Sequence, residues 1–82
     1  MTSRLPRNLS GDELIKALQR FGYVKSRQAG SHIRLTYAGP PQHHITVPRH
    51  DALRIGTLAA IIDGVALAHN LTREELLSKL FG

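Results

Sequence analysis

His32 is the residue of this chain whose type and position are best suited to chemistry, because it follows Gly30 and Ser31 inside a stretch of alternating polarity. A histidine with an unperturbed pKa of about 6.5 can accept or donate a proton near neutral pH. An RNA strand carries its own nucleophile, the 2′-hydroxyl, so its cleavage needs a group that takes that proton and cations that stabilise the phosphorane. Arg34 lies two residues further along, and Arg27 can face it across a hairpin. An ordinary exposed strand histidine has the same spacing, and the residues alone favour that simpler interpretation.

Positive charge is concentrated in the part of the chain that contains His32. The 82 residues include 11 Lys or Arg and 6 Asp or Glu, which gives a formal net charge of +5. Residues 1–34 hold seven of the basic and two of the acidic residues, whereas residues 35–82 hold four of each. Basic side chains gain free energy when they displace counterions from phosphates, so this asymmetry favours a polyanionic partner. A solvated charged face is the alternative.

Length and composition predict one domain over residues 1–82, with a partly ordered N-terminal segment at residues 1–8. There is no cysteine, which excludes disulfides, thiolate nucleophiles and zinc sites that need sulfur. No apolar run follows the first basic residues, and no stretch approaches the roughly 18 apolar residues of a membrane span. We therefore expect a cytoplasmic protein that does not contact a membrane and is a monomer when free.

Two capping boxes mark predicted helix starts. Ser10 is followed by Glu13, and Thr72 is followed by Glu75, in each case with flanking leucines that can form a hydrophobic staple. An apolar stripe at helical spacing predicts a further helix between them. The predicted helices cover residues 11–21, 57–68 and 73–80.

Between the first two helices the polarity alternates with a period of two, which predicts three short strands over residues 23–28, 31–37 and 43–47. The apolar side of such a sheet must meet the helices. The expected fold is therefore α+β, double-stranded-RNA-binding-like in its α-β-β-β-α order, with an additional short C-terminal helix and all helices on one face of a three-stranded antiparallel sheet. The open polar face should carry His32, Arg34, Thr36, His44 and Thr46. Lys25 and Arg27 join it if the weakly alternating first strand keeps the same phase.

The other histidines are weaker candidates. His50 follows Pro48 in a loop and is either a substrate-side contact or second proton carrier, or a polar residue that orients the turn. His44 can border the site, His43 is expected at the rim, and His69 near a helix end is expected only to favour the helix dipole. Adjacent strand residues such as His43 and His44 point to opposite faces, so no metal site is predicted.

Gly56 and Thr57 precede the predicted middle helix, where Thr57 could cap free backbone N–H groups. Such a turn could hold an RNA phosphate or a partner protein, or it could simply start the helix. The aromatic residues Phe21, Tyr23 and Tyr37 are too few and too apolar in context for a base-stacking platform, so we assign them to the core.

Several of these residues occur in motifs that resemble those of the HicA, or YcfA-like, mRNA interferase toxins. The similarity runs in order from about residue 4 to about residue 80, and the pairing of Gly30-Ser31-His32 with Gly56-Thr57-Leu58 is fairly specific. The motifs are Leu5-Pro6-Arg7, Ser10-Gly11-Asp12-Glu13-Leu14-Ile15-Lys16-Ala17-Leu18, Phe21-Gly22-Tyr23, Arg27-Gln28-Ala29-Gly30-Ser31-His32, Val47-Pro48-Arg49-His50 and Ile55-Gly56-Thr57-Leu58. Ala29 stands where relatives often have a basic residue.

The resemblance implies a toxin of a type II toxin–antitoxin system: a metal-independent endoribonuclease, without a cofactor, that cleaves mRNA and is inhibited by a HicB-like antitoxin. It makes His32 the catalytic residue. The residues expected to bind RNA are Lys25, Arg27, Gly30, Ser31, Arg34, His50, Gly56 and Thr57. Two alternatives remain open: a non-catalytic RNA-binding module that uses the same basic face, and a small domain whose positive charge serves an acidic partner protein.

Overall fold

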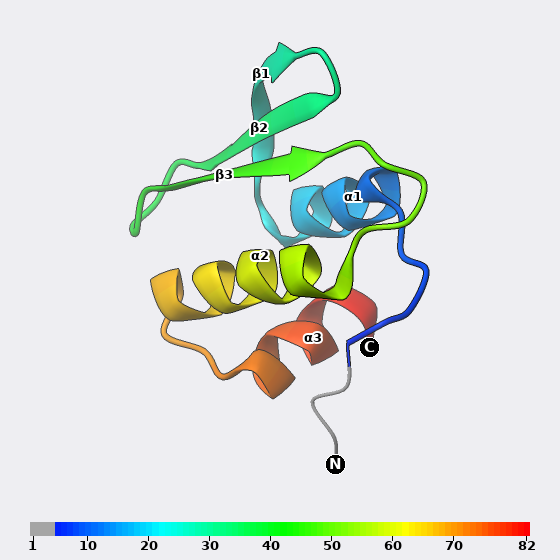
Figure 1. The fold of residues 1–82 in the computed structure, drawn as a ribbon. Helices are drawn as coiled ribbons and strands as arrows, with labels where there is room; N and C mark the ends of the chain where they lie inside the picture. Colours follow the sequence, from blue (N-terminus) through cyan, green and yellow to red (C-terminus); the bar gives the residue numbers. More distant parts are fainter. Residues whose placement is uncertain (1–4) are drawn as a thin grey trace.

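The structure is a computed structural model that describes residues 5–82. Its elements follow the predicted order of helix, three strands and two helices (Figure 1). They are α1 (Gly11–Phe21), β1 (Val24–Ala29), β2 (His32–Tyr37), β3 (His43–Pro48), α2 (Ile55–Ala68) and α3 (Arg73–Phe81). The predicted α+β class is confirmed. Of the N-terminal segment predicted at residues 1–8, the first four lie outside the described residues, while Leu5 packs against the core.

Both predicted capping boxes are present and begin their helices at the predicted residues. The Ser10 hydroxyl accepts a hydrogen bond from the Glu13 N–H at 3.0 Å, and the Glu13 carboxylate accepts one from the Ser10 N–H at 2.9 Å. Thr72 and Glu75 make the same reciprocal pair at 3.1 and 2.8 Å. Each pair satisfies backbone N–H groups that the first helical turn leaves free, which fixes where α1 and α3 start.

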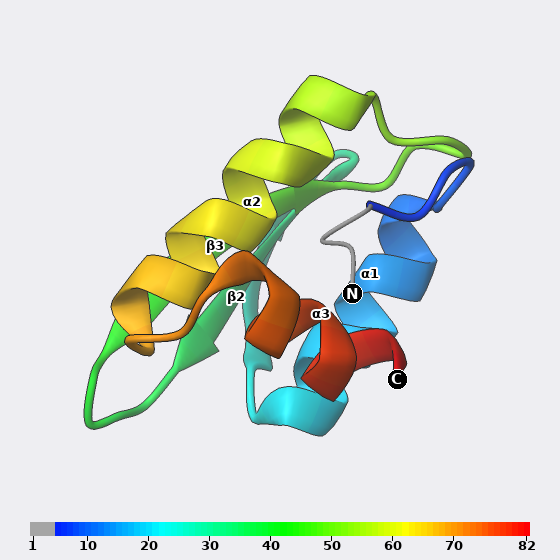
Figure 2. The same ribbon diagram turned by 90° about the horizontal axis from the view of Figure 1, so that it is seen from below.

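The strands form one antiparallel sheet in the order β1-β2-β3. Figures 1 and 2 show α1 and α2 against one face of this sheet and α3 beyond them, so the opposite face of the sheet is not covered by a helix. The core lies between the sheet and the helices, where the alternate strand residues Ile33, Leu35 and Val47 are all at most 2% exposed. The residues between them along β2 and β3 therefore belong to the open face.

The middle helix begins earlier than the sequence predicted. It starts at Ile55, its N-cap is Arg54, and no side chain caps it. Thr57 thus lies within the first turn, and the expectation that it caps the helix is wrong. No single helix among residues 5–82 is long and apolar enough to cross a membrane; α2 and α3 reach that length and composition only as a pair bent by 103°.

Candidate active site on the open sheet face

His32 is the first residue of β2 and is exposed on the open face of the sheet. It lies opposite Ala29 on one side and Pro48 on the other. Both neighbours are small or compact, and neither carries a polar side-chain group that could bind the imidazole. The ring is therefore open to a ligand that approaches this face.

Arg34 and Arg27 share the face with His32. Arg34 lies two residues along β2, and Arg27 lies directly opposite it on β1, so the two guanidinium side chains project on the same side. All three residues are exposed. The two ion pairs among residues 5–82 involve other arginines, which leaves Arg27 and Arg34 available to an external anion.

Lys25, by contrast, does not lie on the open face. The pairing of β1 with β2 is interrupted between Lys25 and Arg27, and Ser26 is the extra residue of a β-bulge. The bulge places Lys25 opposite Leu35, which faces the helices. The prediction for Lys25 required regular alternation along the first strand, and the bulge interrupts that alternation. The Lys25 side chain therefore lies on the helix side of the sheet.

The bulge residue Ser26 belongs to a hydrogen-bonded chain that crosses all three strands. Its hydroxyl donates to the Arg34 carbonyl at 3.3 Å, so it must accept the hydrogen of Thr36, whose Oγ1 lies 2.9 Å away. Thr36 Oγ1 is in turn 2.9 Å from His44 Nδ1 and has no hydrogen left to give. In this contact His44 Nδ1 is therefore the donor and Thr36 Oγ1 the acceptor.

His44 is on the same face as His32 but at the other end of the sheet. It pairs with Thr36, whereas His32 pairs with Pro48, four residues further along β3. At a rise of about 3.3 Å per residue, this separates the two histidines by about 13 Å along the strands. The two rings are too far apart to act on one phosphate together.

The turn before His32 consists of Gly30 and Ser31, one residue later than the gap left at residues 29–30 between the first two predicted strands, since Ala29 still pairs with His32. Gly30 has a φ of +59°, in the left-handed region that favours glycine. The Ser31 carbonyl accepts a hydrogen bond of 2.7 Å from the Arg49 N–H, which ties the hairpin to the segment after β3. Gly30 and Ser31 thus set the position of the backbone that carries His32.

His50 follows in that segment and is exposed. Its carbonyl accepts a hydrogen bond of 2.9 Å from the Gly11 N–H, so its backbone links the end of β3 to the start of α1. That contact fits the structural interpretation of His50. Gly56 and Thr57 lie in the first turn of α2, on the helix side, and the structure does not bring them to the open face.

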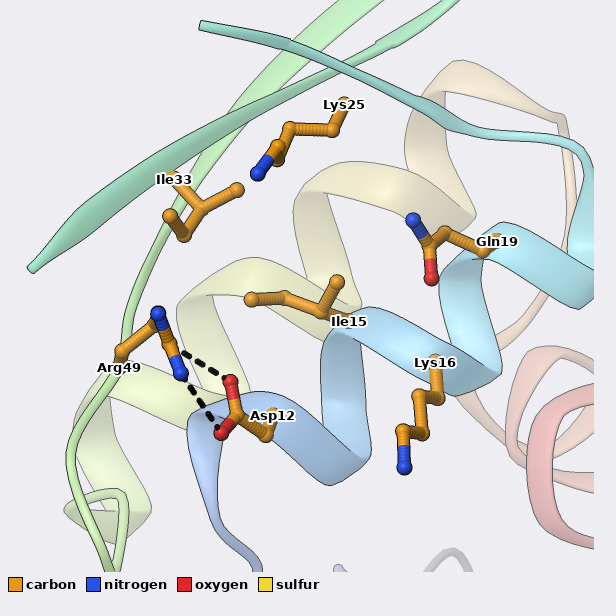
Figure 3. Close-up of a pocket in the computed structure, with 7 residues that line it drawn as sticks. All are labelled: Asp12, Ile15, Lys16, Gln19, Lys25, Ile33 and Arg49. Carbon is orange, nitrogen blue, oxygen red and sulfur yellow. Dashed lines mark hydrogen bonds and ion pairs between the residues drawn. The ribbon is translucent and has the colours of Figure 1, made fainter. Parts of the chain in front are cut away.

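On the helix side, a groove borders the same end of the sheet. It has a volume of about 380 Å³ and lies between α1 and the strands, and we call it the α1 groove (Figure 3). Its cations are Lys16 from α1, Lys25 from β1 and Arg49 after β3. Arg49 binds Asp12 of α1 through two nitrogens at 2.8 and 3.3 Å. Arg49 was part of a motif in the sequence, but its partner was not predicted, because the pairing spans 37 residues.

At the opposite end of the sheet, His43 and His69 both contact the Tyr23 hydroxyl. The sequence predicted His43 at the rim of the site and His69 at a helix end without such a contact. Tyr23 Oη is 2.7 Å from His43 Nδ1 and 3.0 Å from His69 Nε2. The His69 ring also packs edge-on against Tyr37, with centroids 4.4 Å apart. Burial, with a smaller contribution from Tyr37, raises the pKa of Tyr23 to about 12. This cluster joins the residue before β1, the end of β2, the start of β3 and the C-cap of α2, so the minor role predicted for His69 is wrong.

Comparison with known families supports the resemblance carried by the motifs. The sequence model described as HicA toxin of bacterial toxin-antitoxin matches residues 11–66. The chain belongs to the HicA toxin family. The matched region of this HicA-family chain runs from the first residue of α1 into α2 and includes all three strands, His32, and both arginines of the open face. Among individual curated proteins, none matches significantly.

Proposed function

We propose that this HicA-family chain is a metal-independent endoribonuclease that cleaves mRNA, with His32 as general acid or base. The observation that carries the proposal is the position of His32: an exposed imidazole on the uncovered face of the sheet, with Arg27 and Arg34 on that same face. His32 supplies the proton transfer and the arginines supply the positive charge that RNA cleavage requires.

In the proposed step, the 2′-oxygen of a ribose attacks the adjacent phosphorus while its proton passes to a ring nitrogen of His32. The bond between phosphorus and the 5′-oxygen then breaks, and the 5′-oxygen takes a proton from water or from the imidazolium. Arg27 and Arg34 stabilise the negative charge on the non-bridging oxygens, which is greatest in the transition state. Both bonds to phosphorus, the one formed and the one broken, belong to the RNA, which is left with a 2′,3′-cyclic phosphate; the protein exchanges only protons and forms no covalent intermediate.

The family supports a partner as well as a substrate. We propose that a HicB-type antitoxin inhibits the chain by covering the open face, and that the free toxin acts as a monomer in the cytoplasm. Gly30 and Ser31 directly precede His32, and His50 follows two residues after Pro48, the residue opposite His32; all three are proposed to contact the RNA backbone there. A surface with two unpaired arginines suits an acidic inhibitor for the same reason that it suits RNA.

The test is His32→Ala compared with His44→Ala, because both histidines are exposed on the same face and only His32 is assigned to catalysis. RNA is incubated with each purified variant in the presence of a chelator, and product lengths are measured. We expect cleavage by the wild type and by His44→Ala, and none above background by His32→Ala. Cleavage by His32→Ala would overturn the catalytic assignment. Binding of RNA without cleavage by the wild type would instead support the non-catalytic RNA-binding module.

A further inference from the structure

The α1 groove presents a second positively charged surface that the proposed catalytic residues do not use. Lys25 points into it from β1, Lys16 lies on its α1 side, and Arg49 borders it (Figure 3). Its one lining carboxylate, Asp12, is already bound by Arg49. Neither lysine forms an ion pair among residues 5–82, although Lys16 acts electrostatically on the nearby Glu13 carboxylate. The groove therefore keeps a positive charge, mainly that of Lys25, and suits an anion.

With Ser26 in the chain, Lys25 reaches this position because Ser26 is bulged. Regular pairing would place Lys25 on the open face, whereas the observed register puts it opposite Leu35. On the helix side its ammonium group donates a single side-chain hydrogen bond, to Gln28 Oε1 at 3.2 Å. A lysine ammonium has three hydrogens. Two therefore remain for a ligand in the groove.

The α1 groove is connected to the catalytic end of the sheet. Arg49 donates its backbone N–H to Ser31, the residue before His32, and follows Pro48, the residue opposite His32. Arg49 therefore lies at the end of the sheet that carries His32, where a strand leaving the open face would turn toward the helix side. From Arg49 the groove leads to Lys25 and Lys16.

We propose that the α1 groove is a second phosphate-binding site, which holds the RNA strand on one side of the bond that His32 cleaves. This proposal rests on the proposed function for its substrate. No aromatic side chain lines the groove, so it has no platform on which bases could stack. The groove therefore binds the sugar-phosphate backbone and contributes affinity without sequence preference.

The experiment measures the binding of a fluorescent RNA whose 2′-hydroxyls are methylated, so that it cannot be cleaved, over a range of salt concentrations. The variants are Lys25→Gln, Lys16→Gln and their combination. The matched control is Lys79→Gln, which removes one exposed lysine from α3. Melting temperatures show that each variant is folded, and a second RNA of unrelated sequence tests for sequence preference.

We expect each groove variant to lower the slope of log affinity against log salt by about 0.7, and the double variant by about 1.4, equally for both RNAs. Lys79→Gln should keep the wild-type slope. Groove variants with the slope and affinity of the wild type would overturn the proposal. So would variants that bind RNA normally but lose affinity for the antitoxin, since the occupant would then be a protein.

Failure of this proposal is distinguishable from failure of the proposed function. If the groove does not bind RNA, the groove variants keep the salt dependence of RNA binding of the wild type, while His32→Ala still abolishes cleavage. If the catalytic assignment is wrong, His32→Ala continues to cleave, while the difference in salt dependence between Lys25→Gln and Lys79→Gln remains measurable.

Discussion

Arg27 lies directly opposite Arg34 on the open face, and neither forms an ion pair among residues 5–82. Like charges that face each other across a strand pair destabilise a sheet. The pair therefore lowers the free energy of unfolding while it raises the positive potential of the open face. A substitution in this pair therefore tests two properties of the protein at once, its free energy of unfolding and its affinity for RNA.

Arg27→Gln should move the two properties in opposite directions. We expect the free energy of unfolding to rise by about 0.2–1 kcal/mol, because the repulsion from Arg34 is removed. RNA affinity should fall, because one phosphate contact is lost. Urea denaturation and RNA titration check the two effects, with Lys79→Gln as the control. A variant that gains stability and binds RNA as well as the wild type would show that Arg27 does not contact the phosphate.

Gly11→Ala should destabilise the protein even though Gly11 lies in a helix, where alanine is normally preferred. A Cβ at this position would meet the Pro48 carbonyl oxygen and lie 2.9 Å from Arg49 Cα. Both are backbone atoms that cannot rotate away, so α1 must shift from the end of β3. We expect a loss of about 1–3 kcal/mol. Gly64→Ala in α2, where nothing lies within 4 Å, is the control and should stabilise by up to about 1 kcal/mol.

Gly30→Ala tests the turn that precedes His32. Nothing lies within 4 Å of a Cβ at Gly30, so the only cost is that of the left-handed backbone conformation, with φ at +59°. For an L-residue this cost is about 1–2 kcal/mol. Gly30→Asn should lose less, because asparagine tolerates this region better. Equal stability of both variants and the wild type would mean that the hairpin changes to another turn.

The free energy of unfolding should decrease as the pH falls below about 6.5, the ordinary pKa of histidine. Burial, with a smaller effect of His44, lowers the pKa of His43; burial, with a smaller effect of His43, lowers that of His69. Below pH 6.5 the unfolded chain therefore binds protons that the folded chain does not, which favours unfolding until the pH passes the lowered folded pKa values. At higher pH the contribution is constant.

Chemical denaturation at a series of pH values measures this dependence. His69→Gln should reduce the slope, because it removes one of the two rings bound to Tyr23. His50→Gln, which changes an exposed histidine outside the cluster, should leave the slope unchanged. A slope that survives in His69→Gln and disappears in His50→Gln would contradict the assignment to the cluster.

The elements that depend on local chemistry were predictable from the sequence. Ser10 and Thr72 start their helices at the predicted residues because a capping box involves neighbours three residues apart. The positions of His32 and Arg34 on the open face follow from alternation in β2, which has no irregularity. These are the residues on which the candidate site was built.

What the sequence did not determine depends on contacts between distant segments. Four consecutive polar residues, 25–28, obscure the alternation in β1, and only the pairing with β2 shows that Ser26 is the extra residue and that Lys25 faces the helices. The link between Tyr23, His43 and His69 spans 20 and 46 residues, and no local pattern indicates it. The early start of α2 at Ile55 lacks a side-chain cap and so leaves no motif to find.

The bulge in β1 also bears on how the length of this strand can vary. Because Ser26 is the residue without a partner, its deletion would bring Lys25 and Arg27 into regular succession opposite Leu35 and Arg34. No side chain would change face: Arg27 would stay on the open face of the sheet, and Tyr23 would stay in the core. The deletion would remove the extra twist that a bulge introduces and straighten the strand. A change of one residue in length at this point can therefore alter the curvature of the sheet while Lys25 and Arg27 keep their faces.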